Sequence, residues 1–207
     1  MKIRNIALVI TVFCIFSIPQ MASAATFHAE TLNPYPTIFT TLEADGGSGD
    51  GNVDCIGLAN WGIYTGWAAI YRIIYPDYNE QIEVGISWSL AGRLISGFSV
   101  GASWDVYYFW CTPDYLWSGP YGSDHLEPIA HDENTGWFGE DKITEASESY
   151  TNRYVLDGKV PTSGPVYFGL KIKFFFNAPI PGVTEIKGIN PGTAFHLDVT
   201  RMAWGYA

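Results

Sequence analysis

Two stretches of the sequence decide the fold: residues 82–91 (IEVGISWSLA) and residues 97–110 (GFSVGASWDVYYFW). In both, large apolar side chains alternate with small or polar ones through most of the run. A period of two is typical of β-strands, because successive side chains of a strand point to opposite faces of the sheet. At about 3.3 Å per residue the strands would extend about 33 Å and about 46 Å, well beyond ordinary strands. The sequence therefore predicts a β-protein with long strands.

The two stretches are joined near residues 92–96 and are predicted to pair as an antiparallel hairpin. Their large residues share one face only if paired positions have the same parity, which an odd-numbered loop provides. A five-residue loop would pair Trp88 with Val100 and Ile86 with Ala102. The hairpin would have one bulky apolar face and one face of Gly, Ser and Ala, on which another sheet could pack closely.

The rest of the chain also predicts an all-β fold, an antiparallel sheet or sandwich. Period-two alternation recurs in residues 166–176 and 195–199, and residues 150–156 are a further candidate strand. Residues 58–75 fit a helix, from aromatic side chains three and four residues apart, as well as they fit a strand. Residues 112–149 contain nine acids and one lysine. They predict a long acidic loop excursion, with room for one short helix.

The first 24 residues have the pattern of an export signal. Lys2 and Arg4 precede an apolar run of 13 residues, and Ala22-Ser23-Ala24 fits the small-residue rule for cleavage. The apolar run is too short to span a bilayer. We therefore expect cleavage after Ala24 and a protein that is secreted or held at the cell surface.

The mature chain would be a single β-rich domain, residues 25–207, that begins with an extended arm, residues 25–44. It would contain 9 bases and 21 acids, a net charge of −12, because the signal removes two of the 11 bases. This charge argues against nucleic acid or anionic lipid as a partner. No second apolar run is long enough for a transmembrane helix.

Cys55 and Cys111 are the two cysteines that the mature chain would keep. Cysteines of exported proteins tend to oxidise, so a disulfide is predicted, either within one chain or between two subunits. Within one chain it would close a loop of about 57 residues and contribute about 4 kcal/mol in the chain-entropy model.

An oxygen-rich glycine loop is a candidate calcium site, formed by Asp45, Asp50, Asn52 and Asp54. It does not follow the EF-hand pattern. If Asp50 is placed at position five of such a loop, glycines occupy positions one and twelve, where carboxylates belong. The sequence predicts no other cofactor.

Three large aromatic residues in the acidic excursion are candidates for ligand contact: Trp117, Tyr121 and Trp137. No catalytic residue is predicted. Residues 97–101 match the G-x-S-x-G motif, but Ser99 lies inside a period-two run rather than at a strand-to-helix turn. We therefore do not expect an enzyme.

These features favour a structural protein of the cell surface that self-associates through its β-sheets into a sheath, fibre or layer. Its partners would be further copies of the same chain. Two alternatives remain open at this point. One is a secreted β-sandwich that binds carbohydrate or calcium, and the other is a small outer-membrane β-barrel.

Overall fold

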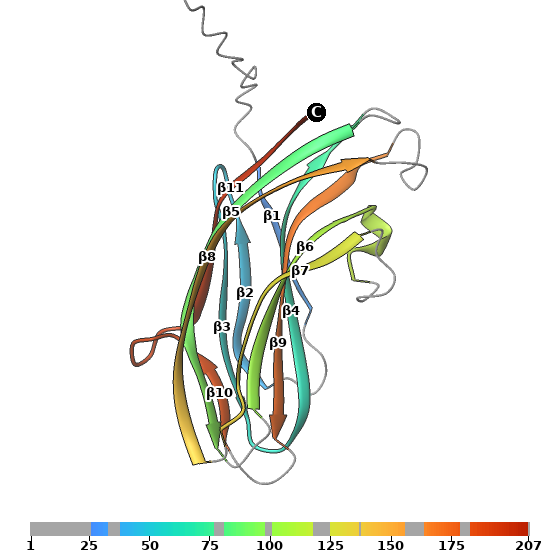
Figure 1. The fold of residues 1–207 in the computed structure, drawn as a ribbon. Helices are drawn as coiled ribbons and strands as arrows, with labels where there is room; N and C mark the ends of the chain where they lie inside the picture. Colours follow the sequence, from blue (N-terminus) through green and yellow to red (C-terminus); the bar gives the residue numbers. More distant parts are fainter. Residues whose placement is uncertain are drawn as a thin grey trace, which may run out of the picture.

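The computed structural model describes residues 26–32, 38–76, 81–97, 101–117, 125–136, 138–155, 164–178 and 183–206. The expected signal sequence lies outside these residues. Two antiparallel sheets pack face to face as a sandwich, which confirms the predicted all-β fold (Figure 1). No helix formed by the described residues is long and apolar enough to cross a membrane.

Strands from both halves of the chain form each sheet. The five-stranded sheet has the order β1 (His28–Leu32), β4 (Gly62–Ile74), β9 (Val166–Ala178), β6 (Gly101–Cys111) and β7 (His125–Asn134). The six-stranded sheet has the order β10 (Thr184–Lys187), β3 (Gly51–Ala59), β11 (Phe195–Tyr206), β5 (Gln81–Gly97) and β8 (Phe138–Val155), and its sixth strand, β2 (Phe39–Gly46), pairs with β3. One 3₁₀ turn, Pro113–Tyr115, follows β6.

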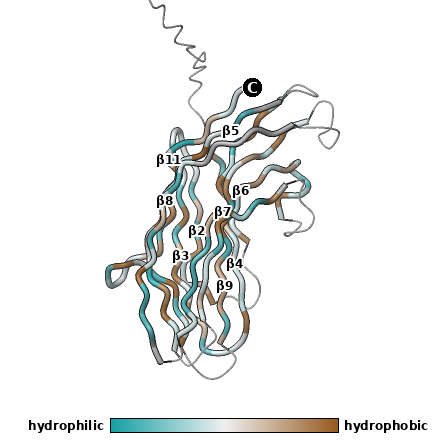
Figure 2. The backbone as a smooth tube through the Cα atoms, in the orientation of Figure 1, coloured by the Kyte–Doolittle hydropathy of each residue, from teal (hydrophilic) through white to brown (hydrophobic). Residues whose placement is uncertain are grey.

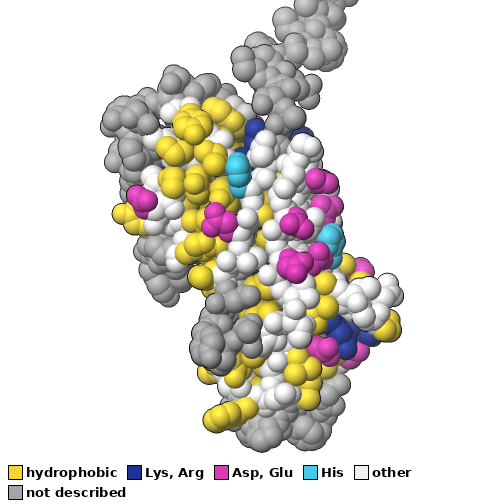
Figure 3. All heavy atoms as spheres, turned by 180° about the vertical axis from the view of Figure 1, so that it is seen from behind, with side chains coloured by type: hydrophobic (Ala, Val, Ile, Leu, Met, Phe, Trp, Pro, Cys, Tyr) yellow, Lys and Arg dark blue, Asp and Glu magenta, His cyan; other side chains and the backbone are white. Residues whose placement is uncertain are grey.

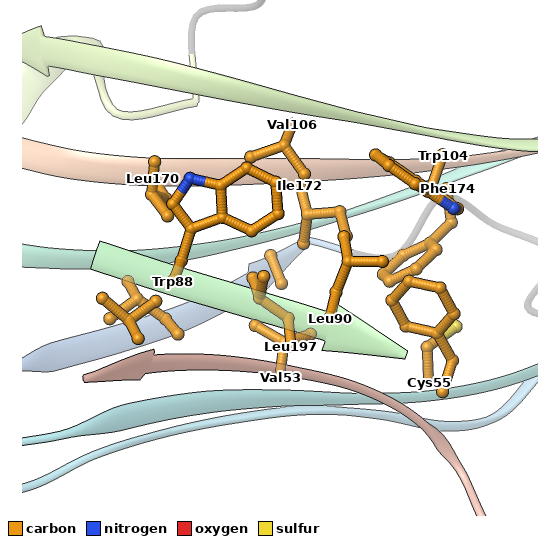
Figure 4. Close-up of a cluster of buried hydrophobic side chains, with 14 of the residues drawn as sticks. Val53, Cys55, Trp88, Leu90, Trp104, Val106, Leu170, Ile172, Phe174 and Leu197 are labelled. Carbon is orange, nitrogen blue, oxygen red and sulfur yellow. The ribbon is translucent and has the colours of Figure 1, made fainter. Parts of the chain in front are cut away.

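The core lies between the two sheets, where the bulky sides of their strands meet. Hydrophobic and hydrophilic residues alternate along the strands (Figure 2). Each strand can therefore bury one side and turn the other outward. In Figure 4, side chains of the six-stranded sheet lie against those of the five-stranded sheet: Val53, Cys55, Trp88, Leu90 and Leu197 on one side, and Trp104, Val106, Leu170, Ile172 and Phe174 on the other.

The predicted hairpin of β5 and β6 is wrong, although both stretches are strands. β5 pairs with β11 and β8, whereas β6 pairs with β9 and β7 in the opposite sheet. Trp88 thus lies beside Val199 and Glu148. Placing the two strands in opposite sheets buries their bulky sides against each other across the core. The alternation fixes which side is buried and leaves the neighbouring strand undetermined.

Three further segments can be compared with the sequence analysis: one for which helix and strand were both open, the acidic segment, and the N-terminal arm. Residues 58–75 are mostly strand β4, not a helix. Most of the acidic segment 112–149 is not a loop excursion, because it forms β7 and much of β8, which are edge strands. Acidic side chains suit an edge because they disfavour pairing with another chain. The described part of the arm, residues 25–44, forms β1 and most of β2, which pair with β4 and β3.

A chain of hydrogen bonds runs from buried Trp104 to the exposed side chain of Lys142 and connects the two edge strands to the core. Trp104 Nε1 donates to Thr144 Oγ1 (3.0 Å), and Thr144 Oγ1 donates to Asp132 Oδ2 (2.6 Å). Lys142 Nζ donates to the other oxygen of Asp132. Burial acts to raise the pKa of Asp132, but the hydrogen bonds from Lys142 and Thr144 outweigh it and hold that pKa below its ordinary value. The chain therefore joins β6 and β7 of one sheet to β8 of the other.

The structure does not join Cys55 and Cys111, so the predicted intramolecular disulfide is wrong. Cys55 lies in the core between the sheets. Cys111 lies in a separate cluster on the outward side of the five-stranded sheet, with Tyr71 and Phe109. The five-stranded sheet therefore separates the two sulfur atoms. Both side chains are fully buried, which also removes them from the surface where subunits would cross-link.

We expect that neither Cys55 nor Cys111 reacts with a thiol reagent, such as Ellman's reagent, on the time scale of mixing when the protein that begins at residue 25 is folded. Burial, and then the neighbouring Asp54 carboxylate, raise the pKa of the Cys55 thiol well above its ordinary value, and the thiolate is the reactive form. In guanidinium without reductant, both thiols should react. Recovery of no thiol in guanidinium would show that the two cysteines are oxidised.

Candidate functional site

The outward side of the five-stranded sheet carries an unusual concentration of aromatic rings. Cross-strand register places Ala69, Lys171 and Tyr107 side by side on β4, β9 and β6, and Tyr71, Gly169 and Phe109 form the next row. We call the outward aromatic side chains of this sheet, together with Trp117 from the turn after β6, the aromatic face. Its members are Trp67, Tyr71, Tyr107, Phe109, Trp117, Tyr167 and Phe175.

Ring contacts organise the aromatic face. Tyr71 stacks on Tyr167, with ring centroids 4.6 Å apart, and His28 stacks on Tyr71 at 5.5 Å. Trp67 and Tyr107 lie 5.8 Å apart across β9. Figure 3, which views the molecule from behind, shows a broad area of hydrophobic side chains interrupted by few charged ones. Outward sides of sandwich sheets are usually polar, so this concentration of rings marks a candidate binding surface.

A carboxylate on the edge strand holds Trp117 over the sheet. Trp117 Nε1 donates to Glu30 Oε2 (3.1 Å), and the Tyr71 hydroxyl donates to Glu30 Oε1 (2.6 Å). Leu116, the residue before Trp117, is buried in the same cluster as Tyr71. Burial, followed by the Glu30 hydrogen bond, raises the pKa of Tyr71 above its ordinary value, so Tyr71 stays a hydrogen-bond donor. The turn after β6 is thus held in place by two side chains: Leu116 through burial and Trp117 through its hydrogen bond to Glu30.

Lys171 lies beneath Trp117 and is only 3% exposed. Its Nζ is 4.7 Å from the centroid of the Phe109 ring and 5.8 Å from that of Trp117. Burial lowers the pKa of Lys171. A pocket of about 30 Å³ opens beside it, lined by Leu32, Trp67, Leu116, Trp117, Leu126 and Lys171.

Lys173, two residues along the same strand, has a different environment. Its Nζ lies 5.8 Å from the Trp67 ring, 5.5 Å from the Phe175 ring and 3.9 Å from Asp105 Oδ2. His131 Nδ1 lies 2.7 Å from the other oxygen of Asp105. Lys173 is therefore half-exposed with a carboxylate beside it, whereas Lys171 is buried among rings.

Of the three predicted ligand contacts, Trp117 lies at this site, and Tyr121 and Trp137 lie outside the described residues. The sequence analysis missed Trp67, Tyr107 and Lys171. A signal for Lys171 was present, because the period-two alternation of residues 166–176 puts the two lysines opposite the core-facing side chains.

The predicted calcium residues lie on β2, β3 and the turn between them. Asp45 pairs with Asn52 across the two strands, and Asp54 Oδ1 is 2.8 Å from His196 Nδ1. Within the described ranges, no three His, Cys, Asp or Glu side chains come together as a metal-ligating group. The three predicted aspartates are therefore not gathered into one carboxylate group, and calcium binding by these residues stays a prediction.

Comparisons with known proteins assign the chain to no family. No family model matches it, and no curated protein matches its sequence. The solved structures that it matches are only weakly similar. The enzymatically active domain of tailspike protein 4 of bacteriophage CBA120 is 8% identical, with a TM-score of 0.27, and the match covers 87% of this chain and 19% of that one. This chain thus spans about a fifth of the tailspike chain's length.

The second similar structure is TmCBM61 in complex with beta-1,4-galactotriose. It is 10% identical, with a TM-score of 0.26, and the match covers 87% of this chain and 88% of that one. Infectious bursal disease virus Gx strain is 10% identical, with a TM-score of 0.19 and coverages of 86% and 39%. Similarity this weak assigns no role to any residue of this chain.

Proposed function

We propose that this protein is a secreted or surface-held β-sandwich that binds carbohydrate on its aromatic face. The observation that carries the proposal is the aromatic face itself, with polar groups fixed among its rings. Small-molecule sites combine apolar and aromatic walls with a few well-placed polar groups. Here the rings of Trp67 and Tyr107 offer a platform, and Glu30 and Lys171 offer the polar groups.

The fixed geometry supports binding rather than a purely structural role. Glu30 uses one hydrogen bond to hold Tyr71 and another to hold Trp117, so the walls of the site are ordered before any ligand arrives. Preorganisation reduces the entropy that binding must offset. Sugars present apolar ring faces and hydroxyl edges, which match aromatic rings and a carboxylate respectively. The predicted export signal supports a location where glycans are accessible.

The test is a glycan panel titrated by calorimetry into the protein that begins at residue 25. We expect at least one glycan to bind, and we expect Trp67→Ala and Tyr107→Ala to weaken that glycan about tenfold, because a ring contact is worth about 1 kcal/mol. Trp61→Ala is the matched control, since Trp61 is 71% exposed and lies outside the face. A panel without a binder, or equal losses in all three variants, would contradict the proposal.

Self-association is the second candidate, and one observation favours it. The outward side of β5 carries Gly85, Ser87, Ser89 and Ala91. With residues of β8 and with His196, its residues line an open hollow of about 400 Å³. Small side chains let another sheet approach closely. In this candidate the predicted sheath or fibre would form through the six-stranded sheet, without the β5–β6 hairpin.

Light scattering with and without reductant distinguishes the two candidates. Carbohydrate binding requires no mass above that of one chain. Self-association through β5 predicts larger species that reductant does not disperse and that Ser89→Arg converts to monomers.

A further inference from the structure

Lys171 is unusually buried for a lysine on the outward side of a sheet. It is 3% exposed, and its Nζ lies over the Phe109 and Trp117 rings. Among the described residues, no carboxylate forms an ion pair with it. A buried charge without a partner costs free energy, which is why such lysines are rare and often functional. Contacts between the ammonium group and the two rings offset only part of that cost.

Glu30 holds Trp117 on the same face but is not paired with Lys171, and both of its oxygens already accept a hydrogen bond. One accepts the hydrogen bond of Tyr71 and the other that of Trp117. Lys171 therefore lines the small pocket with no carboxylate paired to it among the described residues. Burial lowers its pKa, and the buried Cys111 thiol is the ionisable group that acts to raise that pKa. An incoming anion would complete this arrangement.

The pocket's size and walls restrict that anion. A volume of about 30 Å³ suits a small group such as a carboxylate and is too small for a sugar ring. Leu32, Leu116 and Leu126 supply apolar walls, so an anion inside would be partly shielded from water. A charge-assisted hydrogen bond is stronger in such surroundings than in water.

Trp67 connects this pocket to the ring platform. It lines the pocket and also lies 5.8 Å from Tyr107 in the neighbouring row of the aromatic face. A sugar ring lying against Trp67 would place a substituent within reach of the pocket. We infer that the ligand of the aromatic face is a carboxylate-bearing sugar, such as a uronate, whose carboxylate is bound by Lys171 between Trp67 and Trp117. This inference rests on the proposed carbohydrate binding.

The test compares each glycan with its own methyl ester, which removes the charge and keeps the sugar. Short oligomers of galacturonate, glucuronate and mannuronate are titrated as acids and as esters at pH 7 and 0.15 M salt. Short oligomers are preferred because the net charge of −12 of the protein that begins at residue 25 disfavours long polyanions. We expect the wild type to bind one acid at least tenfold more tightly than its ester.

Lys171→Met is expected to remove the preference for the acid. Lys173→Met is the matched control, because Lys173 lies on the same strand and face, but beside Asp105. It should keep the preference. Lys171→Arg, which retains the charge, should keep part of it. The melting temperature of Lys171→Met should not fall, since methionine fills similar space without a desolvated charge. A purely structural Lys171 would instead lower it.

Equal binding of acid and ester, or a preference that survives Lys171→Met, would overturn the inference. If a neutral glycan binds and the Trp67→Ala variant loses it, the proposed carbohydrate binding stands and the carboxylate site alone fails. If no glycan in either form binds, the proposed function fails first, and this inference fails with it.

Discussion

Trp104→Ala should lower the free energy of unfolding by about 3–5 kcal/mol. Trp104 is 2% exposed and lies in the core beside Phe195, with ring centroids 6.4 Å apart. Its removal leaves a cavity between the sheets that rigid strands cannot close. It also removes the donor to Thr144, and through Thr144 the connection to Asp132. For a domain whose total stability is about 5–15 kcal/mol, this is a large share. Guanidinium unfolding followed by circular dichroism measures it.

Two variants separate the causes of this loss. Trp104→Phe keeps most of the ring and removes the hydrogen bond to Thr144, so we expect a smaller loss of about 1–2 kcal/mol. Trp61→Ala removes the same side chain from a site that is 71% exposed, and it should change stability by less than about 0.5 kcal/mol. If Trp104→Ala unfolded at the same guanidinium concentration as Trp61→Ala, the core position of Trp104 would be wrong.

Gly169→Ala should cost about 3 kcal/mol, at the upper end of overpacking effects. A Cβ atom at Gly169 would lie 2.0 Å from the Ile70 carbonyl oxygen and 2.7 Å from the Tyr71 Cα atom. Both are backbone atoms of the paired strand β4, so no side-chain rotation relieves the clash and the two strands must separate locally. The Tyr71 ring would shift with its backbone. We therefore also expect weaker glycan binding in this variant.

Gly205→Ala is the control for Gly169→Ala. Gly205 also lies in a long strand, but a Cβ atom there would meet nothing within 4 Å. Its unfolding free energy should stay within about 0.5 kcal/mol of the wild type. The melting temperatures of Gly169→Ala and Gly205→Ala, measured by thermal unfolding under the same conditions, test this prediction. Equal melting temperatures would contradict the close approach of β9 to β4.

The sequence predicted strands well where one side had to be buried. Alternation around Trp88 and Trp104 located β5 and β6, since a period of two is a local property. It could not identify the neighbouring strand, because pairing depends on contacts between distant segments. The acids of residues 112–149 predicted exposure correctly at many positions, but exposure is compatible with an edge strand as well as with a loop. Composition alone does not separate the two.

For the candidate site as well, local sequence features were predictable and contacts between distant segments were not. Trp117 was predicted because a large ring in an acidic segment needs an explanation. Lys171 was missed because its significance depends on Trp117, Phe109 and Glu30, which come from three other elements. The disulfide prediction failed for a related reason. Counting cysteines gives the number of sulfur atoms, and only the fold reveals that a sheet lies between Cys55 and Cys111.

The placement of β5 and β6 in opposite sheets has a consequence for how the chain folds. Because most consecutive strands lie in different layers, neither sheet can be assembled from a contiguous half of the polypeptide. β2 and β3 pair as sequence neighbours, but β4 must pair with β9, and β5 with β11. Such a topology has a high contact order, which slows folding and favours a single cooperative transition. Fragments that end after β6 should therefore remain unfolded, and refolding should proceed over milliseconds to seconds rather than microseconds.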